Sequence, residues 1–279
     1  MDNNPRSVQM YLQEEKVVVP STDKVSLEAR LYRGTQRKHT CIVLTHPYGP
    51  LGGNLDNNVV KALFDNFASQ GFMTVRFNFR GSGRSTGRAS WKGQGEADDV
   101  LAICNYVRSK KEIAPQNIVL CGYSYGSVAA GAITRQVPEL AGFISISYPS
   151  GVLWFLTFFG SNKLKQQLCE IPSTVPKLFI SGTKDSFTSE ANFQKFIAEL
   201  PSENRSVVSV ADATHFWQNQ ENLVVAHVNQ WMGRTGLNAK SMKAATAAAL
   251  KVSPAVTATR GLSSPISPAS PWTPADDGT

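Results

Sequence analysis

At residues 119–130 the sequence reads Val-Leu-Cys-Gly-Tyr-Ser-Tyr-Gly-Ser-Val-Ala-Ala. An apolar run typical of a buried strand ends in a Gly-x-Ser-x-Gly pattern, and the small residues after it favour a helix that begins close to the strand. A serine at such a turn has a strained backbone, and Gly122 and Gly126 let strand and helix approach each other. The helix N-terminus directs N–H groups and a partial positive charge at the serine. We therefore predict that Ser124 is a nucleophile for acyl transfer; the alternative is a serine in an ordinary glycine-rich turn.

The segments on either side of this stretch predict parallel strands covered by helices. Continuous apolar runs are typical of strands buried on both faces, whereas alternating apolar residues in 25–32 predict an antiparallel edge pair with 16–20. Apolar residues at helical spacing predict the helices between the strands. The expected strands are 16–20, 25–32, 41–45, 72–77, 117–121, 141–147, 177–181 and 205–210, and the expected helices are 57–70, 95–110, 124–136, 189–200 and 221–232.

A serine nucleophile needs a base that accepts its proton, and the sequence contains four histidines. Only His215 lies in a loop after a late strand, at the sheet edge expected for Ser124. His39 precedes a strand, His46 lies in another loop and His227 lies in the last expected helix. We therefore predict that His215 is the base; the alternative is a packed loop histidine.

The base in turn needs a carboxylate that orients it and stabilises its charged form. Asp185 follows its own expected strand and can meet His215 across the sheet edge. Asp212 lies only three residues before His215, and so close a neighbour seldom reaches back to the imidazole. We predict that Asp185, rather than Asp212, is the orienting acid.

The loop His46–Asn54 follows the strand expected over 41–45 and is rich in Gly and Pro. Backbone N–H groups at the carboxyl end of a parallel strand can stabilise a developing oxyanion. Since Pro47 has no N–H, we predict that the N–H groups of Tyr48 and Tyr125 form the oxyanion hole. The alternative is a rigid connecting turn.

The most apolar segment is 152–159, between the sixth and seventh expected strands. It is too short to span a bilayer. We expect it to belong to a small cap that lines an apolar substrate pocket with Trp154, Phe155 and Phe158. Ordinary core packing and contact with a lipid surface are the alternatives.

Residues 78–87 contain glycines at spacing G-x-G-x-x-x-G, which does not fit the dinucleotide fingerprint. We expect a structural loop in which arginines form hydrogen bonds with neighbouring loops. Glu96, Asp98 and Asp99 open the next helix and are expected to favour its dipole and cap. Ligand spacing predicts neither a metal site nor a nucleotide site, so we expect no cofactor.

Composition predicts one folded unit with extensions: an N-terminal extension over 1–15, a domain over 16–235 and a disordered Ala/Ser/Pro-rich tail over 236–279 whose Ser/Thr-Pro pairs suit phosphorylation. The net charge of +7 lies partly in the tail, and scattered basic residues without aromatic neighbours do not predict nucleic-acid binding. Four cysteines without paired spacing indicate reduced thiols, and we expect a cytoplasmic protein without a signal or integral membrane segment.

Four motifs in one order resemble the α/β-hydrolase superfamily: 46–54, 76–85, Gly-Tyr-Ser-Tyr-Gly at 122–126, and His215-Phe216. The likeness runs from about Lys16 to Met232 and is greatest to small, minimally capped hydrolases related to dienelactone hydrolases and serine aminopeptidase-like domains. It implies an α/β fold with an eight-stranded, mostly parallel sheet, a small cap insertion and a triad of Ser124, Asp185 and His215.

These features predict a serine hydrolase that cleaves an ester, thioester or amide of a small acyl substrate, more in the manner of a carboxylesterase than a peptidase. The alternatives are a binding or scaffold protein that keeps the fold without turnover, and an enzyme that acts at a lipid surface. The residues do not indicate an oligomeric state.

Overall fold

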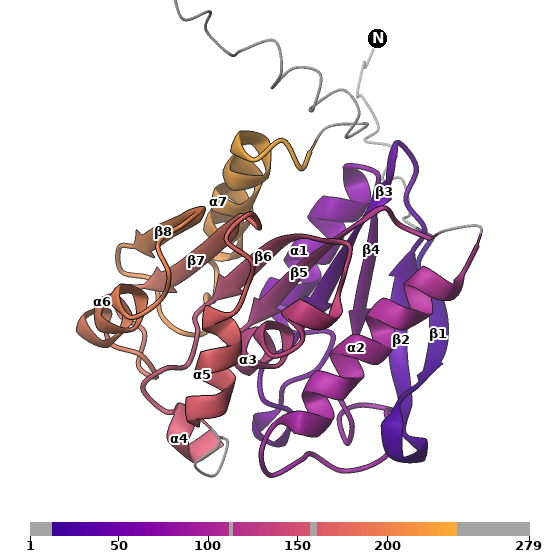
Figure 1. Ribbon diagram of the computed structural model, residues 1–279, viewed down its shortest axis with the longest axis horizontal. Coiled ribbons are helices and arrows are strands. Elements are labelled where there is room, and N and C mark those ends of the chain that lie inside the picture. The colour runs from indigo at the N-terminus through magenta and orange to yellow at the C-terminus, as the bar shows by residue number, and fades with distance from the viewer. Residues whose placement is uncertain (1–12, 112–113, 157–160, 239–279) are drawn as a thin grey trace, which may run out of the picture.

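The computed structural model describes residues 13–111, 114–156 and 161–238. In this part of the chain one eight-stranded sheet has the order β1-β2-β4-β3-β5-β6-β7-β8 (Figure 1). β2 is antiparallel to both of its neighbours, and every other pair is parallel. The strands are β1 (Glu15–Pro20), β2 (Ser26–Tyr32), β3 (Arg37–Thr45), β4 (Phe72–Phe77), β5 (Asn117–Tyr123), β6 (Leu140–Ile146), β7 (Lys177–Gly182) and β8 (Arg205–Val210).

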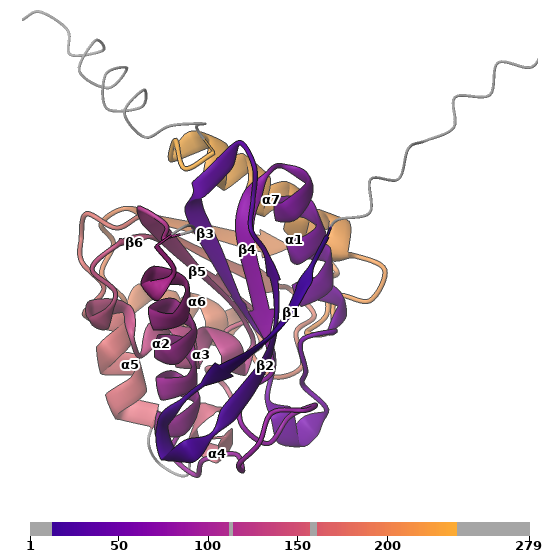
Figure 2. The same ribbon diagram turned by 90° about the vertical axis from the view of Figure 1, so that its right-hand side faces the viewer.

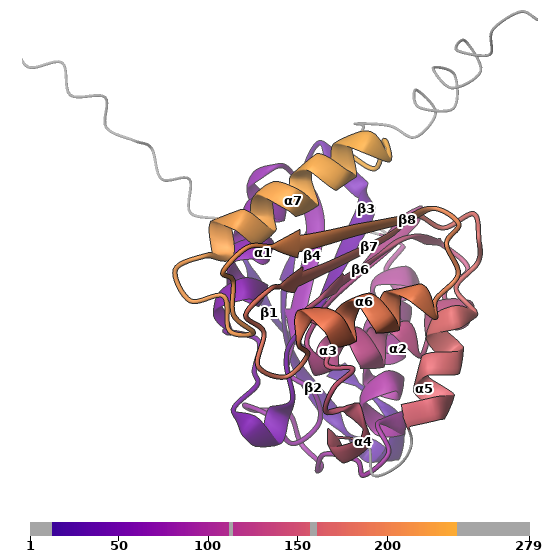
Figure 3. The same ribbon diagram turned by 90° about the vertical axis from the view of Figure 1, so that its left-hand side faces the viewer.

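Helices cover both faces of the sheet (Figures 2 and 3). α1 and α7 lie side by side on one face, and α2, α3, α5 and α6 cover the other. The helices are α1 (Asn58–Ser69), α2 (Gln94–Ser109), α3 (Tyr125–Gly131), α4 (Leu153–Leu156), α5 (Ser161–Cys169), α6 (Glu190–Ala198) and α7 (Glu221–Arg234).

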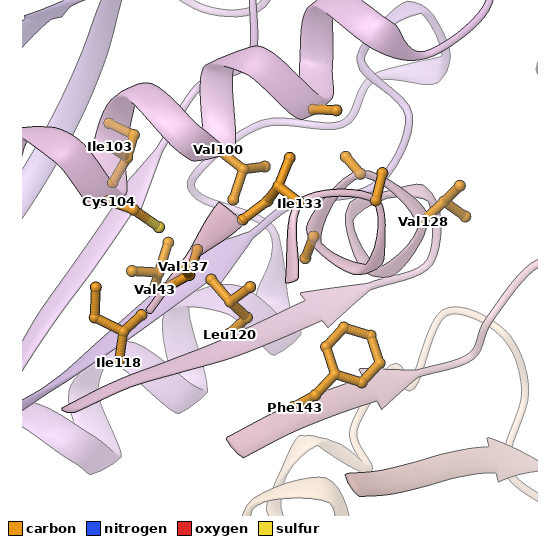
Figure 4. Packing of buried hydrophobic residues seen from close by; sticks show 14 of the residues in the cluster. Val43, Val100, Ile103, Cys104, Ile118, Leu120, Val128, Ile133, Val137 and Phe143 are labelled. Carbon is orange, nitrogen blue, oxygen red and sulfur yellow. The ribbon is translucent and has the colours of Figure 1, made fainter. Parts of the chain in front are cut away.

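The central strands separate two buried apolar clusters, as expected for strands that are covered on both faces. Figure 4 shows the cluster beneath α2 and α3, where Val43 and Leu120 of the sheet face Val100 and Ile133. Cys41, Cys104 and Cys121 are buried and unpaired, so they pack as small apolar side chains, and Cys169 is also a free thiol.

The predicted α/β architecture is confirmed, with small differences in the elements. β3 begins at Arg37, earlier than expected, and the helix expected over 124–136 ends at Gly131 and is followed by a 3₁₀ turn, Thr134–Gln136. The expected cap region holds α4 and α5. The ends of the chain, residues 1–12 and 239–279, lie outside the described residues, so the extension and the tail stay predictions.

The last described residue lies at the amino ends of the parallel strands. Arg37 Nε, at the start of β3, donates a 2.7 Å hydrogen bond to the carbonyl oxygen of Asn238. Figure 1 shows the chain leaving α7 at the top of the molecule, whereas α4 lies at the bottom. In the described ranges, every helix is too short or too polar to cross a membrane.

Candidate active site

Ser124 lies at the sharp turn between β5 and α3. Its backbone has φ 54° and ψ −125°, a region that non-glycine residues rarely adopt. The two neighbouring glycines make the turn sterically feasible. A methyl group on Gly122 would lie 2.3 Å from the Cα atom of Ser127, and one on Gly126 would lie 2.6 Å from the carbonyl oxygen of His46. The strained serine is therefore held at the start of a helix, against the end of β3.

Ser124, His215 and Asp185 form one hydrogen-bonded chain at the carboxyl edge of the sheet. Asp185 follows β7 and His215 follows β8. Asp185 Oδ2 lies 2.8 Å from His215 Nδ1, and His215 Nε2 lies 2.9 Å from Ser124 Oγ. Because Asp185 accepts, Nδ1 carries the imidazole proton, and Nε2 is left to accept the serine hydroxyl. The side chains of all three residues are buried.

The other oxygen of Asp185 holds the carboxylate in place. Asp185 Oδ1 accepts the backbone N–H groups of Phe187 at 2.9 Å and Thr188 at 3.0 Å. Asp212, the competing acid, points elsewhere: it forms an exposed ion pair with Lys184 at 2.7 Å. The hydrogen bond from Lys184 and the positive charge of its ammonium group lower the pKa of Asp212.

A cavity of about 730 Å³ opens at Ser124 and His215. One part of its wall is apolar and includes Leu51 and Phe187, and another is polar and includes Asn57 and Glu221. Tyr48 also lines the cavity, next to the ring of Tyr125, with 4.9 Å between the two centroids. The two residues predicted to supply the oxyanion hole are thus in contact with each other.

Of the segment expected to line a substrate pocket, Val152 and Leu156 are the described residues in the cavity wall. Phe155 is 59% exposed and lies outside the described lining, because the short helix α4 turns Leu156 rather than Phe155 toward the cavity. Phe158 lies outside the described residues, as does the side chain of Trp154.

Part of the chain matches a known family. The model of the X-Pro dipeptidyl-peptidase (S15) family matches residues 23–154, a range that includes Ser124 but ends before Asp185 and His215.

Solved structures match over most of the described chain. An alpha-beta serine hydrolase homologue from Coxiella burnetii is 26% identical, covering 75% of this chain and 93% of that chain with a TM-score of 0.63. A serine hydrolase without lid from Xanthomonas campestris is 21% identical (79% and 94% covered, TM-score 0.66). An esterase from Pyrococcus furiosus is 19% identical (80% and 93% covered, TM-score 0.63). The chain belongs to the α/β-hydrolase superfamily. It is a hydrolase of α/β fold.

In this α/β-hydrolase, His46 fixes the loop that carries Tyr48. The N–H of Phe79 donates to His46 Nε2 at 2.9 Å, so Nδ1 carries the proton and donates to the carbonyl oxygen of Pro47 at 2.6 Å. Burial lowers the pKa of His46 to about 4, and its bond to the Pro47 carbonyl opposes that shift. His46 is therefore a neutral bridge between two loops. Sequence reasoning placed it in the oxyanion loop but did not find this role.

Two contacts hold the loop that carries His215. The Tyr123 hydroxyl donates to the carbonyl oxygen of His215 at 2.7 Å, and burial raises the pKa of Tyr123, which keeps it a donor. Trp217 Nε1 donates to Ser147 Oγ at 2.9 Å. Sequence reasoning did not identify Trp217; its position two residues after His215 is the only signal that the sequence offers.

The loop over 78–87 of this α/β-hydrolase is structural, as predicted. Arg80 binds the buried carboxylate of Asp99 through Nε at 3.0 Å and Nη2 at 2.8 Å. Glu96 lies in the first turn of α2, as predicted, whereas Asp99 lies beyond that turn, and both carboxylates also bind groups of the neighbouring loops. Glu96 Oε1 accepts the backbone N–H of Ser90 at 2.8 Å, and its Oε2 accepts the hydroxyl of Tyr125 at 3.3 Å. Across the described ranges, His, Cys, Asp and Glu form no group suited to a metal ion.

Proposed function

We propose that this chain is a serine hydrolase that cleaves an ester of a small acyl substrate through an acyl-enzyme on Ser124. One observation supports this function most directly: a serine, an imidazole and a carboxylate are joined by hydrogen bonds of 2.9 and 2.8 Å at the wall of an open cavity. The order of the three groups, carboxylate to imidazole to hydroxyl, is the order that acyl transfer requires.

In the first half of the reaction, Ser124 Oγ attacks the carbonyl carbon of the substrate while its proton moves to His215 Nε2. Asp185 stabilises the imidazolium that forms and keeps Nδ1 protonated. The carbonyl oxygen becomes an oxyanion, which the N–H groups of Tyr48 and Tyr125 stabilise at the start of α3. When the tetrahedral intermediate collapses, the leaving alkoxide takes the proton from His215 Nε2.

In the second half, a water molecule attacks the acyl-enzyme and gives its proton to His215 Nε2. Collapse of the second intermediate returns the proton to Ser124 Oγ and releases the acid. Neither half requires a metal ion or an organic cofactor, because proton transfer and charge stabilisation use only the chain's own groups.

An ester bond is favoured over an amide by the comparison with solved structures. One of the similar structures is named an esterase. The match to the X-Pro dipeptidyl-peptidase family makes cleavage of a peptide bond after proline the second candidate.

Labelling with a fluorophosphonate probe tests the nucleophile. We expect the wild type to label, Ser124→Ala and His215→Ala to lose the label, and the matched control Asp212→Asn to keep it. A folded wild type that does not react would favour a binding protein without turnover instead.

The bond type is tested by comparing p-nitrophenyl esters of increasing chain length with an X-Pro p-nitroanilide. We expect turnover of the esters to exceed that of the anilide. Faster turnover of the anilide would overturn the ester assignment and favour the peptidase.

A further inference from the structure

Large exposed apolar side chains gather around the mouth of the cavity. Leu51 is 69% exposed and Phe216 is 52% exposed, and both line the cavity. Phe155, on α4 next to the lining residue Leu156, is 59% exposed. Trp91, in the loop between β4 and α2, is 71% exposed. We call these four residues, Leu51, Trp91, Phe155 and Phe216, the rim.

Trp91 belongs to the same edge as the cavity, although it lies outside the described lining. A methyl group on Gly93 would lie 3.0 Å from the hydroxyl of Tyr125 and 3.6 Å from Leu164 of α5. The loop with Trp91 therefore lies against α5, which follows α4 in the chain. Figures 1 and 3 agree, since the loop before α2 runs past α4 at the bottom of both views. The four rim residues thus come from four separate segments at the carboxyl edge of the sheet.

Three exposed cations accompany the rim: Arg88 and Lys92 flank Trp91 in its loop, and Lys163 lies at the start of α5. None of these three has an ion pair with any residue in the described ranges.

Two acids nearby are neutralised by ion pairs: Asp56 pairs with Arg76, and Asp99 pairs with Arg80. Glu96, Asp98 and Glu221 accept hydrogen bonds from neutral groups and keep their negative charge. The edge around Trp91 therefore combines apolar surface with three cations that form no ion pair in the described ranges.

Single exposed apolar residues are common, but a group of aromatic side chains with cations around a cavity mouth indicates a binding surface. A second copy of the chain fits it poorly, because a two-fold contact would place like cations of the two copies close together. An anionic lipid surface suits both features. Tryptophan prefers the headgroup level of a bilayer, and lysine and arginine are attracted to anionic headgroups.

We propose that the rim binds an anionic lipid surface, with Arg88, Lys92 and Lys163 against the headgroups and the cavity mouth turned toward the bilayer. Binding does not depend on the hydrolytic chemistry proposed above. If both hold, the substrate reaches Ser124 from the lipid layer rather than from bulk water.

Flotation of the full chain with vesicles tests this proposal. We expect the wild type to float with vesicles of phosphatidylcholine mixed with phosphatidylserine, and not with phosphatidylcholine alone. Trp91→Ser should lower the partition coefficient about tenfold, because a large apolar side chain no longer inserts. The triple change Arg88→Glu/Lys92→Glu/Lys163→Glu should lower it by about 100-fold or more.

Two matched controls separate the rim from general effects. Val18 is 69% exposed but lies on β1, so Val18→Ser should leave binding unchanged. The exposed residues Lys38, Lys111 and Lys195 lie away from the rim. The variant Lys38→Glu/Lys111→Glu/Lys195→Glu changes the net charge as much as the rim triple variant does. We expect it to lower the partition coefficient by less than about threefold. All five proteins carry the same residues 239–279.

Three results would overturn the proposal. The wild type could fail to float with anionic vesicles. The control triple variant could lose as much binding as the rim triple variant, which would mean that net charge alone drives binding. Sedimentation velocity could reveal a wild-type dimer that Trp91→Ser dissociates, which would mean that a second copy covers the rim.

Discussion

Trp217 Nε1 donates a hydrogen bond of 2.9 Å to Ser147 Oγ, and both residues have left-handed backbones, with φ of 54° and 49°. Ser147 directly follows β6, and Trp217 lies two residues after His215. Such backbones are costly for residues other than glycine and persist where the surroundings hold them. The contact therefore fastens the loop that follows β8 to the end of β6, which lies two strands away in the sheet.

Replacing the indole should loosen His215. Trp217→Phe keeps most of the apolar volume but leaves Ser147 Oγ without its donor, so we expect a loss of about 1–2 kcal/mol in the free energy of unfolding. We also expect kcat to fall more than KM rises, because the imidazole is held less firmly. Denaturant unfolding and ester kinetics measure the two effects. In a double-mutant cycle with Ser147→Ala the effects should be non-additive; simple additivity would contradict the coupling.

The two aspartates should differ sharply in their effect on catalysis. Asp185→Asn removes the acceptor that holds the His215 tautomer, so kcat should fall by about 10⁴-fold. Asp212 is 74% exposed at its side chain and pairs with Lys184, so Asp212→Asn should change kcat by less than about twofold. Steady-state ester hydrolysis measures both. Equal losses in the two variants would contradict a special role of Asp185, and a larger loss in Asp212→Asn would mean that Asp212 supports the base.

Buried His46 should make the protein acid-sensitive. Its pKa in the folded state, about 4, lies below its ordinary value of 6.5. The unfolded chain therefore binds the proton more readily. The stabilising contribution of neutral His46 is complete above pH 6.5 and is lost as the pH falls toward 4, to a total of about 3 kcal/mol.

Thermal unfolding between pH 7 and about 4 measures that slope. His46→Gln offers an amide donor and acceptor that do not titrate, so its Tm should depend less on pH. The control His39→Gln replaces an exposed imidazole and should keep the wild-type slope. A His46→Gln variant as steep as the wild type would rule out His46 as the acid-sensitive group.

The tight turn at Ser124 should tolerate no side chain at Gly126. A methyl group there would lie 2.6 Å from two backbone carbonyl oxygens, those of Thr45 and His46, so we expect Gly126→Ala to cost about 3 kcal/mol of stability. Gly233 is a matched helical control, because its nearest contact would be 3.6 Å away, at the flexible amide of Asn238. Gly233→Ala should raise stability by about 0.5–1 kcal/mol. Denaturant unfolding compares them, and equal stability in the two variants would contradict the packing argument.

Much of this fold could be predicted because strands and helices are marked by the pattern of residues within each segment. Buried parallel strands are continuous apolar runs, and the order of strands and helices limits the topology. Since parallel strands end at one edge, residues after β5, β7 and β8 were expected to meet, and Ser124, Asp185 and His215 do lie together. The labelling experiment tests their roles.

Contacts between distant loops were not predictable in the same way. Asp99 looked like a dipole group because it lies near the start of a helix, but Arg80 lies close enough to bind it only after folding. The pairing of Trp217 with Ser147 and the bridge formed by His46 likewise depend on loops that come together in three dimensions. For Phe155, the phase of a short helix decided which side chain faces the cavity, and apolar composition alone does not determine that phase.

The bond between Arg37 and Asn238 has a practical consequence for handling the protein. A reporter or surface linker fused after residue 238 would leave the domain at the amino ends of the parallel strands, whereas Ser124 lies at their carboxyl ends. Immobilising the domain through that point would present the cavity mouth to the medium, so substrates too large to diffuse freely could be delivered to it as particles or films.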